Sequence, residues 1–399
     1  MSLGILIALG ILAATFMIFK IGDVFSPWFI TVIIWFGILL MFQFDTLLYP
    51  LGDRFYTSIM LWVPIFCTAS MLTYYALPSG VSDREQKKME SIDINSTIFN
   101  VLFYLSLVMT PLYLYRIMQT IMMFDTADML YNLRVLAVHG EESYGILNYT
   151  YVINMSLLAV GIWHYPKIPL WKLLAIYFVC SISAFAIMEK GMLFYFLAAT
   201  VFVLYEKRVI KMRTILIWGV VIVVLFFLMN MARDSSGLDE DERMTFLDFL
   251  AIYILSPSVA YERISEDMSG QWGTNTFYTI YLFLNRFGFN FEQAAKLQGF
   301  VWVPLPTNVY TIFQPFYQDF GQKGVAVFAM LYGTASGWVY RLFRNGSRYG
   351  RCIYIYFVYV LLLQFFQDNL IQSSVIVLQY LFFVWLMTQQ KYFINWRAR

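Results

Sequence analysis

The chain has 399 residues, of which 60% are hydrophobic and 20% aromatic, and its mean hydropathy is +0.65. Only 13% of its residues are charged, about half the share found in an average soluble domain. A soluble fold of this composition would have too few polar side chains to cover its surface. A soluble enzyme of one or two globular domains is therefore excluded, and a polytopic membrane protein remains. The formal net charge of +2 predicts no nucleic-acid partner.

The apolar residues form eleven runs that we interpret as membrane-spanning helices, since a span needs roughly 17–25 predominantly apolar residues. The first run begins at Ser2 without a basic leader and is interpreted as a retained helix rather than a signal peptide. No internal repeat divides the chain, which predicts one all-α integral-membrane domain over residues 1–399. The runs lie near residues 2–19, 28–48, 55–78, 98–117, 150–165, 172–188, 191–206, 213–231, 324–342, 352–370 and 372–390.

The positions of Lys and Arg in the loops set the predicted orientation. With eleven spans and the C-terminus inside, the cytoplasmic side holds 17 of the 27 basic residues, and most acidic residues lie outside. The reverse orientation would put every basic loop on the wrong face. The predicted outer loops are residues 118–149 and 232–322, and the predicted cytoplasmic loops are 79–97, 206–213 and 341–351.

The large outer loop contains two apolar stretches that are too short to span a membrane. They are Phe246–Leu255 and Phe277–Phe287. Amphipathic helices on the outer leaflet, or dipping into it, fit them better.

Several cations lie on the outward side, although the net charge of that side is negative. Charge at membrane depth is costly and usually functional, so positive charge retained there suggests an anionic ligand. Arginine suits a diphosphate because its planar fork makes bidentate, charge-assisted hydrogen bonds. The alternative is that these cations are snorkelling anchors or pair with the acidic cluster at Asp239–Glu242. The cations are Arg116, Arg134, Lys190 beside Glu189, Arg233 and Arg286.

A polar and aromatic run precedes the predicted span at 324–342. It reads TNVYT from Thr307 to Thr311 and YQDFGQKG from Tyr317 to Gly324. Its hydroxyls and amides suit sugar hydroxyls, its rings suit the apolar faces of sugars, and its glycines allow close approach. The same run is also compatible with a plain helix entrance that has Asp319 near the N-terminus.

This run resembles the Wzy-type O-antigen polymerases, which carry T-N-V-Y-T, a spacer and Y-x-D-F-G-x-x-G before a late membrane helix. Leu133-Arg134 in an early outer loop and the turn Glu189-Lys190-Gly191 add to the resemblance. Where this chain has Glu189-Lys190-Gly191, many members carry a Ser-Arg-Gly-like turn, so Lys190 departs from the pattern at that position. The plan of many spans with one large outer loop in the second half of the chain also agrees.

The resemblance implies a glycosyltransferase at the periplasmic face of the bacterial inner membrane. It would transfer a growing glycan from undecaprenyl diphosphate to the non-reducing end of an incoming lipid-linked repeat unit. A chain-length co-polymerase and a flippase would be its partner proteins in the same membrane, and membrane lipid would surround it. The leaving diphosphate needs fixed cations, and we favour arginines over Mg²⁺ because no acidic metal pair lies beside TNVYT. No metal or other cofactor is expected, and Cys67, Cys180 and Cys352 are expected to be buried apolar side chains.

The acceptor hydroxyl needs a general base, and carboxylates near the outer boundary are the candidates. His139 and His164 are expected to be exposed or satisfied rather than catalytic. Asp368 belongs to a polar group with Gln364, Gln367 and Asn369 at the outer end of the tenth run, where a helix cap is the alternative. The expected catalytic residues are Asp319, Glu189 and Arg233; the expected diphosphate ligands are Arg134, Lys190, Arg286 and Arg116; the expected glycan contacts are Asn308, Tyr310, Thr311, Tyr317 and Asp368.

Two other functions stay open from the sequence. A flippase or transporter of lipid-linked oligosaccharides would also need outward cations, but transporters usually show internal repeats and ionisable groups near the bilayer midplane, and neither is visible. A relative of the O-antigen ligases would perform the same chemistry on another acceptor. Such ligases generally rely on a histidine in the large outer loop, and residues 232–322 contain none.

Overall fold

The structure is a computed structural model. The residues that it describes divide into two compact units, each built from several stretches of the chain. Unit 1 comprises Met1–Pro78, Val220–Arg341 and Val360–Val375, and unit 2 comprises Ser79–Gly219, Leu342–Tyr359 and Ile376–Arg399. The structure describes residues 2–45, 47–78, 94–123, 145–186, 190–215, 217, 219–221, 224, 251–265, 271–294, 298–304 and 306–389.

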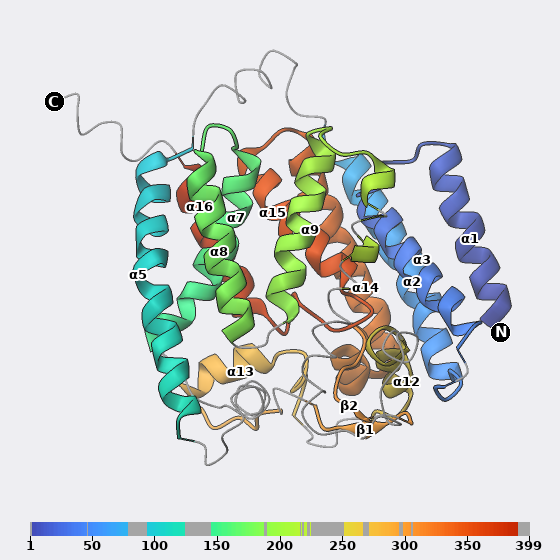
Figure 1. Cartoon of the computed structure of the whole chain (residues 1–399). Coiled ribbons are helices and arrows are strands. Elements are labelled where there is room, and N and C mark those ends of the chain that lie inside the picture. Colours follow the sequence, from blue (N-terminus) through green and yellow to red (C-terminus); the bar gives the residue numbers. More distant parts are fainter. Residues whose placement is uncertain are drawn as a thin grey trace. The chain divides into compact units, whose positions relative to one another are not determined.

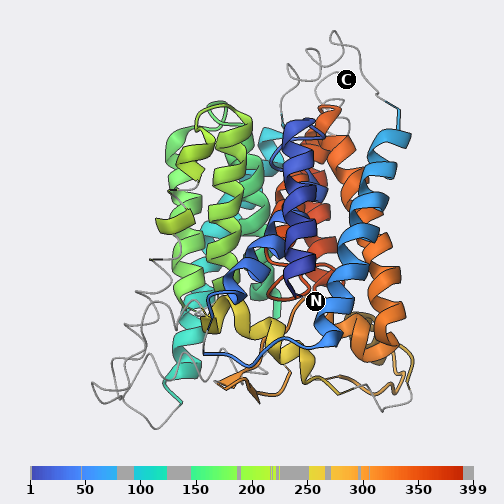
Figure 2. The ribbon, with the colours of Figure 1, turned by 90° about the vertical axis from the view of Figure 1, so that its right-hand side faces the viewer.

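In unit 1, the long helices among the described residues are accompanied by short elements, which lie at the end where α3 (Asp53–Ala76) and α14 (Gln314–Arg344) begin (Figures 1 and 2). Residues of α14 beyond Arg341 belong to unit 2. A short two-stranded ribbon is antiparallel and pairs Val301 with Thr307. The elements are α1 (Ser2–Ile18), α2 (Pro27–Phe42), α3 (Asp53–Ala76), the π-helical turn η3 (Ala251–Leu255), α12 (Ser256–Glu262), α13 (Tyr278–Asn285), β1 (Val301–Trp302), β2 (Pro306–Thr307) and α14 (Gln314–Arg344).

Unit 2 is a helical bundle whose core is rich in tyrosine. Tyr195 donates a hydrogen bond to the Met155 carbonyl (3.1 Å), and Tyr380 donates one to the Cys352 carbonyl (2.7 Å). Its elements are α5 (Ser96–Ile121), the 3-10 turn η1 (Gly145–Asn148), α7 (Tyr149–Trp163), α8 (Leu170–Ala186), α9 (Lys190–Glu206), most of α15 (Arg348–Leu362) and most of α16 (Ser374–Thr388).

Three described helices are long and apolar enough to cross a membrane: Asp53–Ala76, Ser96–Ile121 and Gly145–Trp163. Several shorter apolar helices accompany them, so the fold is that of a helical protein suited to a membrane. Each expected run overlaps described helical residues. For the run at 213–231 these are residues 213–215, 217, 219–221 and 224, and the rest of that run lies outside the described residues. The three cysteines are free and buried, as expected.

Small residues let α14 approach α3 closely within unit 1. A Cβ atom added to Gly333 would lie 2.4 Å from the Phe66 carbonyl oxygen, and one added to Gly337 would lie 2.3 Å from that of Ser70. The two glycines are one helical turn apart, which places them on the same face. This spacing is the small-xxx-small arrangement that lets membrane helices pack backbone to backbone.

A break divides α14 into a short entrance and a long helix. Gly321 has φ 61° and ψ −154°, a conformation that is essentially restricted to glycine. The entrance carries Tyr317 and Asp319, so the glycine redirects the chain directly after the aromatic half of the motif.

The described short elements between residues 232 and 322 differ partly from the sequence prediction. The helix expected at 277–287 is confirmed as the eight-residue α13. For the stretch 246–255, the described part is a π-helical turn at Ala251–Leu255 that continues into α12.

Gln364–Asn369 were expected at the end of a helix, but α15 ends at Leu362 and they lie in the connection to α16.

Candidate functional site

The TNVYT run begins at Thr307, the last residue of strand β2. It is fixed in unit 1 by one phenol and by the backbone directly after the run. Tyr310 is buried, and its hydroxyl donates a hydrogen bond to the Gly299 carbonyl (2.8 Å). The Ile312 amide donates to the Gln364 carbonyl (2.9 Å). Burial raises the pKa of the Tyr310 phenol above its ordinary value, so this group stays a neutral hydrogen-bond donor.

Thr311 and Asn308 offer polar groups from this run. Thr311 is 1% exposed, and its hydroxyl finds no hydrogen-bond partner among the residues that the structure describes. Asn308 is half-buried. A buried hydroxyl without a hydrogen-bond partner lowers the stability of the fold. Thr311 is therefore the residue of this run whose hydroxyl would gain most from a hydrogen bond to a ligand.

Asp319 ties the motif to the segment before α13. Its Oδ1 accepts hydrogen bonds from the Asn275 backbone amide (3.1 Å) and side-chain amide (2.9 Å). Its Oδ2 accepts one from the Thr276 backbone amide (2.6 Å). The Thr276 hydroxyl in turn donates to the Pro315 carbonyl (3.1 Å). The sequence alone allowed Asp319 to cap its own helix. In the structure its carboxylate instead binds the segment at Asn275 and Thr276, elsewhere in unit 1.

Gln364 is the centre of a buried network behind the motif. Its Oε1 accepts hydrogen bonds from the indole nitrogens of Trp35 (3.0 Å) and Trp62 (3.3 Å). Phe313 stacks on Trp35 at 4.8 Å, and Phe316 stacks on Trp62 at 6.1 Å between ring centroids. The amide thus orients two indoles against which the rings of the motif pack.

Asp368 is occupied by donors from its own connection and from α14. It accepts hydrogen bonds from the Tyr332 hydroxyl (2.5 Å) and from the backbone amides of Leu370 (2.9 Å) and Gln372 (2.9 Å). It is 3% exposed. The geometry is that of a carboxylate cap on the turn before α16, the alternative that the sequence left open.

Tyr317 presents its ring next to a cation that sequence reasoning did not single out. The Arg54 guanidinium lies 4.6 Å from the Tyr317 ring centroid. Tyr261 meets the same ring edge-on at 5.5 Å. Burial raises the pKa of the Tyr261 phenol, and its oxygen lies 2.7 Å from the Ser58 hydroxyl in a hydrogen bond.

The expected cations are only partly described. Arg286 belongs to unit 1 and is exposed at the C-cap of α13. Lys190 begins α9 in unit 2, and its side chain lies outside the described residues. Glu189, Arg134 and Arg233 also lie outside them.

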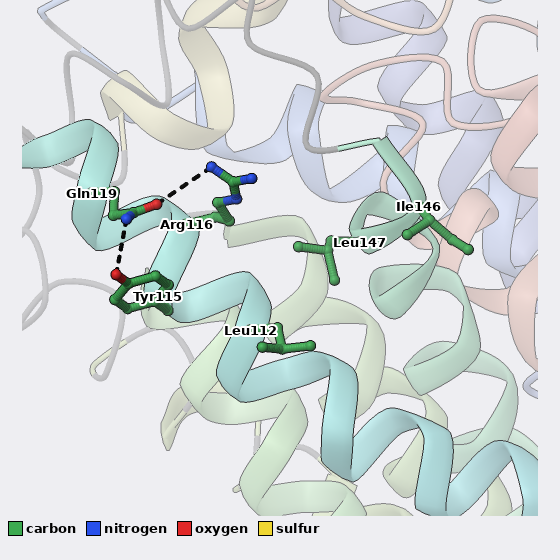
Figure 3. A pocket seen from close by; sticks show the side chains of 6 residues that line it. All are labelled: Leu112, Tyr115, Arg116, Gln119, Ile146 and Leu147. Carbon is green, nitrogen blue, oxygen red and sulfur yellow. Dashed lines mark hydrogen bonds between the residues drawn. The ribbon is translucent and has the colours of Figure 1, made fainter.

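Arg116 lines a cavity of about 500 Å³ in unit 2 (Figure 3). Its Nη1 donates to the Gln119 side chain (3.4 Å), whose amide donates to the Tyr115 hydroxyl (2.9 Å). The remaining lining residues are apolar, so the cavity has one polar side and one apolar side. The lining residues are Leu112, Tyr115, Arg116, Gln119, Ile146 and Leu147.

Several residues that hold this region of unit 1 together were not singled out from the sequence. Arg54 lies at the start of α3, Trp35 and Trp62 are core residues of apolar helices, and Asn275 and Thr276 precede α13. A usable signal existed for Arg54, since it is a cation on the predicted outer side. Among the described residues, no group of three or more His, Cys, Asp and Glu side chains is arranged to hold a metal ion.

Comparison with known proteins gives one informative similarity. No family model and no solved structure matches the chain. A curated protein named "Putative O-antigen polymerase", from Escherichia coli (strain K12), is 25% identical over 122 residues. The similarity covers 30% of this chain and 31% of that protein, so the chain matches about a third of its relative's length. It supports the resemblance to the Wzy-type polymerases that the motif indicated.

Proposed function

We propose that this protein is an integral membrane polymerase that joins lipid-linked oligosaccharide repeat units into a surface polysaccharide of the O-antigen type. The observation that carries the proposal is the placement of the run Thr307–Gly324. The run that resembles the polymerase motif contributes the buried polar side chains of Thr307, Thr311 and Gln314, and its Asp319 holds the buried Thr276 amide. The similarity to the protein named as an O-antigen polymerase supports the same class.

The proposed topology is that of the sequence analysis. Eleven helices would span the bacterial inner membrane, with residues 118–149 and 232–322 on the periplasmic side. The excess of Lys and Arg in the other loops supports this orientation. The substrates would be undecaprenyl-diphosphate-linked donor and acceptor, and a chain-length co-polymerase and a flippase would be neighbours.

The proposed reaction exchanges one bond to an anomeric carbon for another. An acceptor hydroxyl oxygen attacks the anomeric carbon of the donor glycan, the bond from that carbon to the diphosphate oxygen breaks, and the hydroxyl proton passes to a carboxylate. The lipid diphosphate leaves with the electron pair of the broken bond. Arg134, Arg233, Lys190, Arg286 and Arg116 are the proposed sources of positive charge for it.

The carboxylate that accepts the proton is proposed to be Asp319 or Glu189. A carboxylate has room for about four hydrogen bonds on its two oxygens, and three are used on Asp319. Asp319 therefore keeps one acceptor position while it holds Asn275 and Thr276.

The glycan is proposed to contact the run that carries the resemblance. Asn308 and the buried hydroxyl of Thr311 supply hydrogen-bonding groups, and Tyr310 and Tyr317 supply rings. Asp368 would act through the connection that it caps, because its oxygens are already engaged.

Reconstitution of the purified chain with a lipid-linked repeat unit tests the proposal. A polymerase yields a ladder of longer glycans on the lipid. Replacing Arg134, Arg233 or Arg286 by Ala should abolish extension while leaving expression intact. Substrate that crosses the bilayer without becoming longer would instead establish a transporter, and three Ala variants that all still polymerise would remove the arginines from the mechanism.

A further inference from the structure

Two arginines of unit 1 that the proposed mechanism does not use lie in one corner of the fold. The corner joins the start of α3, the end of α12 and the entrance of α14. We call it the arginine corner and define it by Arg54, Arg263, Tyr49 and Tyr317. Each guanidinium lies over one tyrosine ring and donates to backbone carbonyl oxygen.

Arg54 is immobilised through one of its nitrogens. Its Nη1 donates to the carbonyls of Ile264 (2.6 Å) and Tyr261 (3.2 Å). The same guanidinium lies 4.6 Å from the Tyr317 centroid. Nε and Nη2, which together form the fork that binds phosphate or carboxylate oxygens in pairs, make no hydrogen bond with any residue in the described ranges.

Arg263, the C-cap of α12, repeats the arrangement of Arg54. Its Nη1 donates to the Trp302 carbonyl (2.8 Å), and its guanidinium lies 4.4 Å from the Tyr49 ring centroid. Arg263 is exposed, whereas Arg54 is half-buried. Arg263 directly precedes Ile264, whose carbonyl holds Arg54, so the two arginines share one stretch of backbone.

The neighbouring carboxylate does not neutralise either cation. Glu262 turns to the start of α3, where its Oε1 accepts the Phe55 backbone amide (2.5 Å). A helix N-terminus favours a negative charge, which explains this choice of partner. Within the described ranges, neither Arg54 nor Arg263 forms an ion pair.

We propose that the arginine corner binds a phosphate-type anion through the unused edges of Arg54 and Arg263. The backbone carbonyls and the tyrosine rings fix both guanidiniums before the ligand arrives, so little side-chain entropy is lost on binding. The anion is either the headgroup phosphate of a membrane lipid or the diphosphate of a lipid-linked substrate. Only the second source rests on the proposed function.

Calorimetric titration of the full-length protein in neutral detergent with inorganic diphosphate tests the proposal. The unaltered chain should bind, and Arg263→Gln should weaken binding about tenfold or more, since a hydrogen bond to a charged group is worth about 1.5–3 kcal/mol. Arg54→Lys should weaken it similarly, because lysine keeps the charge but lacks the fork. Lys20→Gln removes an exposed cation of unit 1 that lies outside both the motif and the corner and should leave binding unchanged.

Two outcomes would overturn the proposal: no binding to the unaltered chain at low salt, or equal binding to the Arg54→Lys/Arg263→Gln double variant. Arg263 is exposed and makes one described hydrogen bond, so its variant should fold even if the Arg54 variant does not. Competition then identifies the source of the anion. Displacement by phosphatidylglycerol assigns a lipid headgroup, and stronger displacement by farnesyl diphosphate assigns the lipid-linked diphosphate. Diphosphate binding without glycan extension would remove the proposed function and leave the corner intact.

Discussion

Asp319→Asn is the substitution that tests most closely how the motif is held. The carboxylate of Asp319 accepts two hydrogen bonds from Asn275 and one from Thr276. Asn275 is 6% exposed and Thr276 is fully buried. An amide has one acceptor oxygen, so the variant must turn its NH₂ group toward at least one of these donors.

The expected cost follows from the bonds that are lost. If the amide oxygen keeps both donors of Asn275, the Thr276 amide loses its partner and stays buried. Losing such a charge-assisted bond costs about 1.5–3 kcal/mol. Because about 1.4 kcal/mol is a factor of ten, local opening at Thr276 should become about ten to a hundred times more frequent.

Hydrogen exchange of the backbone amides in detergent measures this opening. We expect faster exchange at Asn275 and Thr276 in Asp319→Asn. Glu292→Gln is the matched control, because Glu292 is exposed and its carboxylate makes no described hydrogen bond. Unchanged exchange at Thr276 in Asp319→Asn would refute the reasoning. A variant that keeps this protection but no longer extends glycans would assign Asp319 to proton transfer instead.

Two further substitutions test the packing behind the motif, each by thermal unfolding in one detergent. Gly337→Ala would place a Cβ 2.3 Å from the Ser70 carbonyl oxygen and should destabilise the folded protein by about 1–3 kcal/mol. Gly37→Ala is its control, because a Cβ there meets no atom within 4 Å. Equal melting temperatures of the two variants would refute the close approach of α14 to α3. Gln364→Leu removes the oxygen that accepts hydrogen bonds from two buried indoles and should destabilise the folded protein by about 1–3 kcal/mol for each unpaired indole. Gln379→Leu is its control, because the Gln379 side chain makes no hydrogen bond with the described residues. A Gln364→Leu protein as stable as this control would contradict the role of Gln364.

The helices were predictable because hydropathy is a local property of the sequence. The run expected at 55–78 is α3, Asp53–Ala76, and the run expected at 98–117 extends as α5 to Ile121. The boundary after Leu362 was not predictable in this way. Asp368 caps the following turn there, and its capping depends on backbone geometry that hydropathy does not report.

The motif could be found in the sequence, but its contacts could not. The motif drew attention to Asp319 and Tyr317, yet their partners come from distant parts of the chain. Asp319 holds residues 43 and 44 positions earlier, and Arg54 contacts carbonyls 207 and 210 positions away. Such pairings follow from how the helices of unit 1 pack, and a single sequence carries no local signal for them.

Polymerisation by the purified chain is the direct measure of whether this protein joins repeat units. The protein is reconstituted into vesicles with an undecaprenyl-diphosphate-linked repeat unit, and the lipid-linked glycans are separated by size. We expect a ladder of products that are whole multiples of the repeat unit. Glycans that stay at one repeat unit, in vesicles where the protein is folded and the substrate accessible, would contradict it.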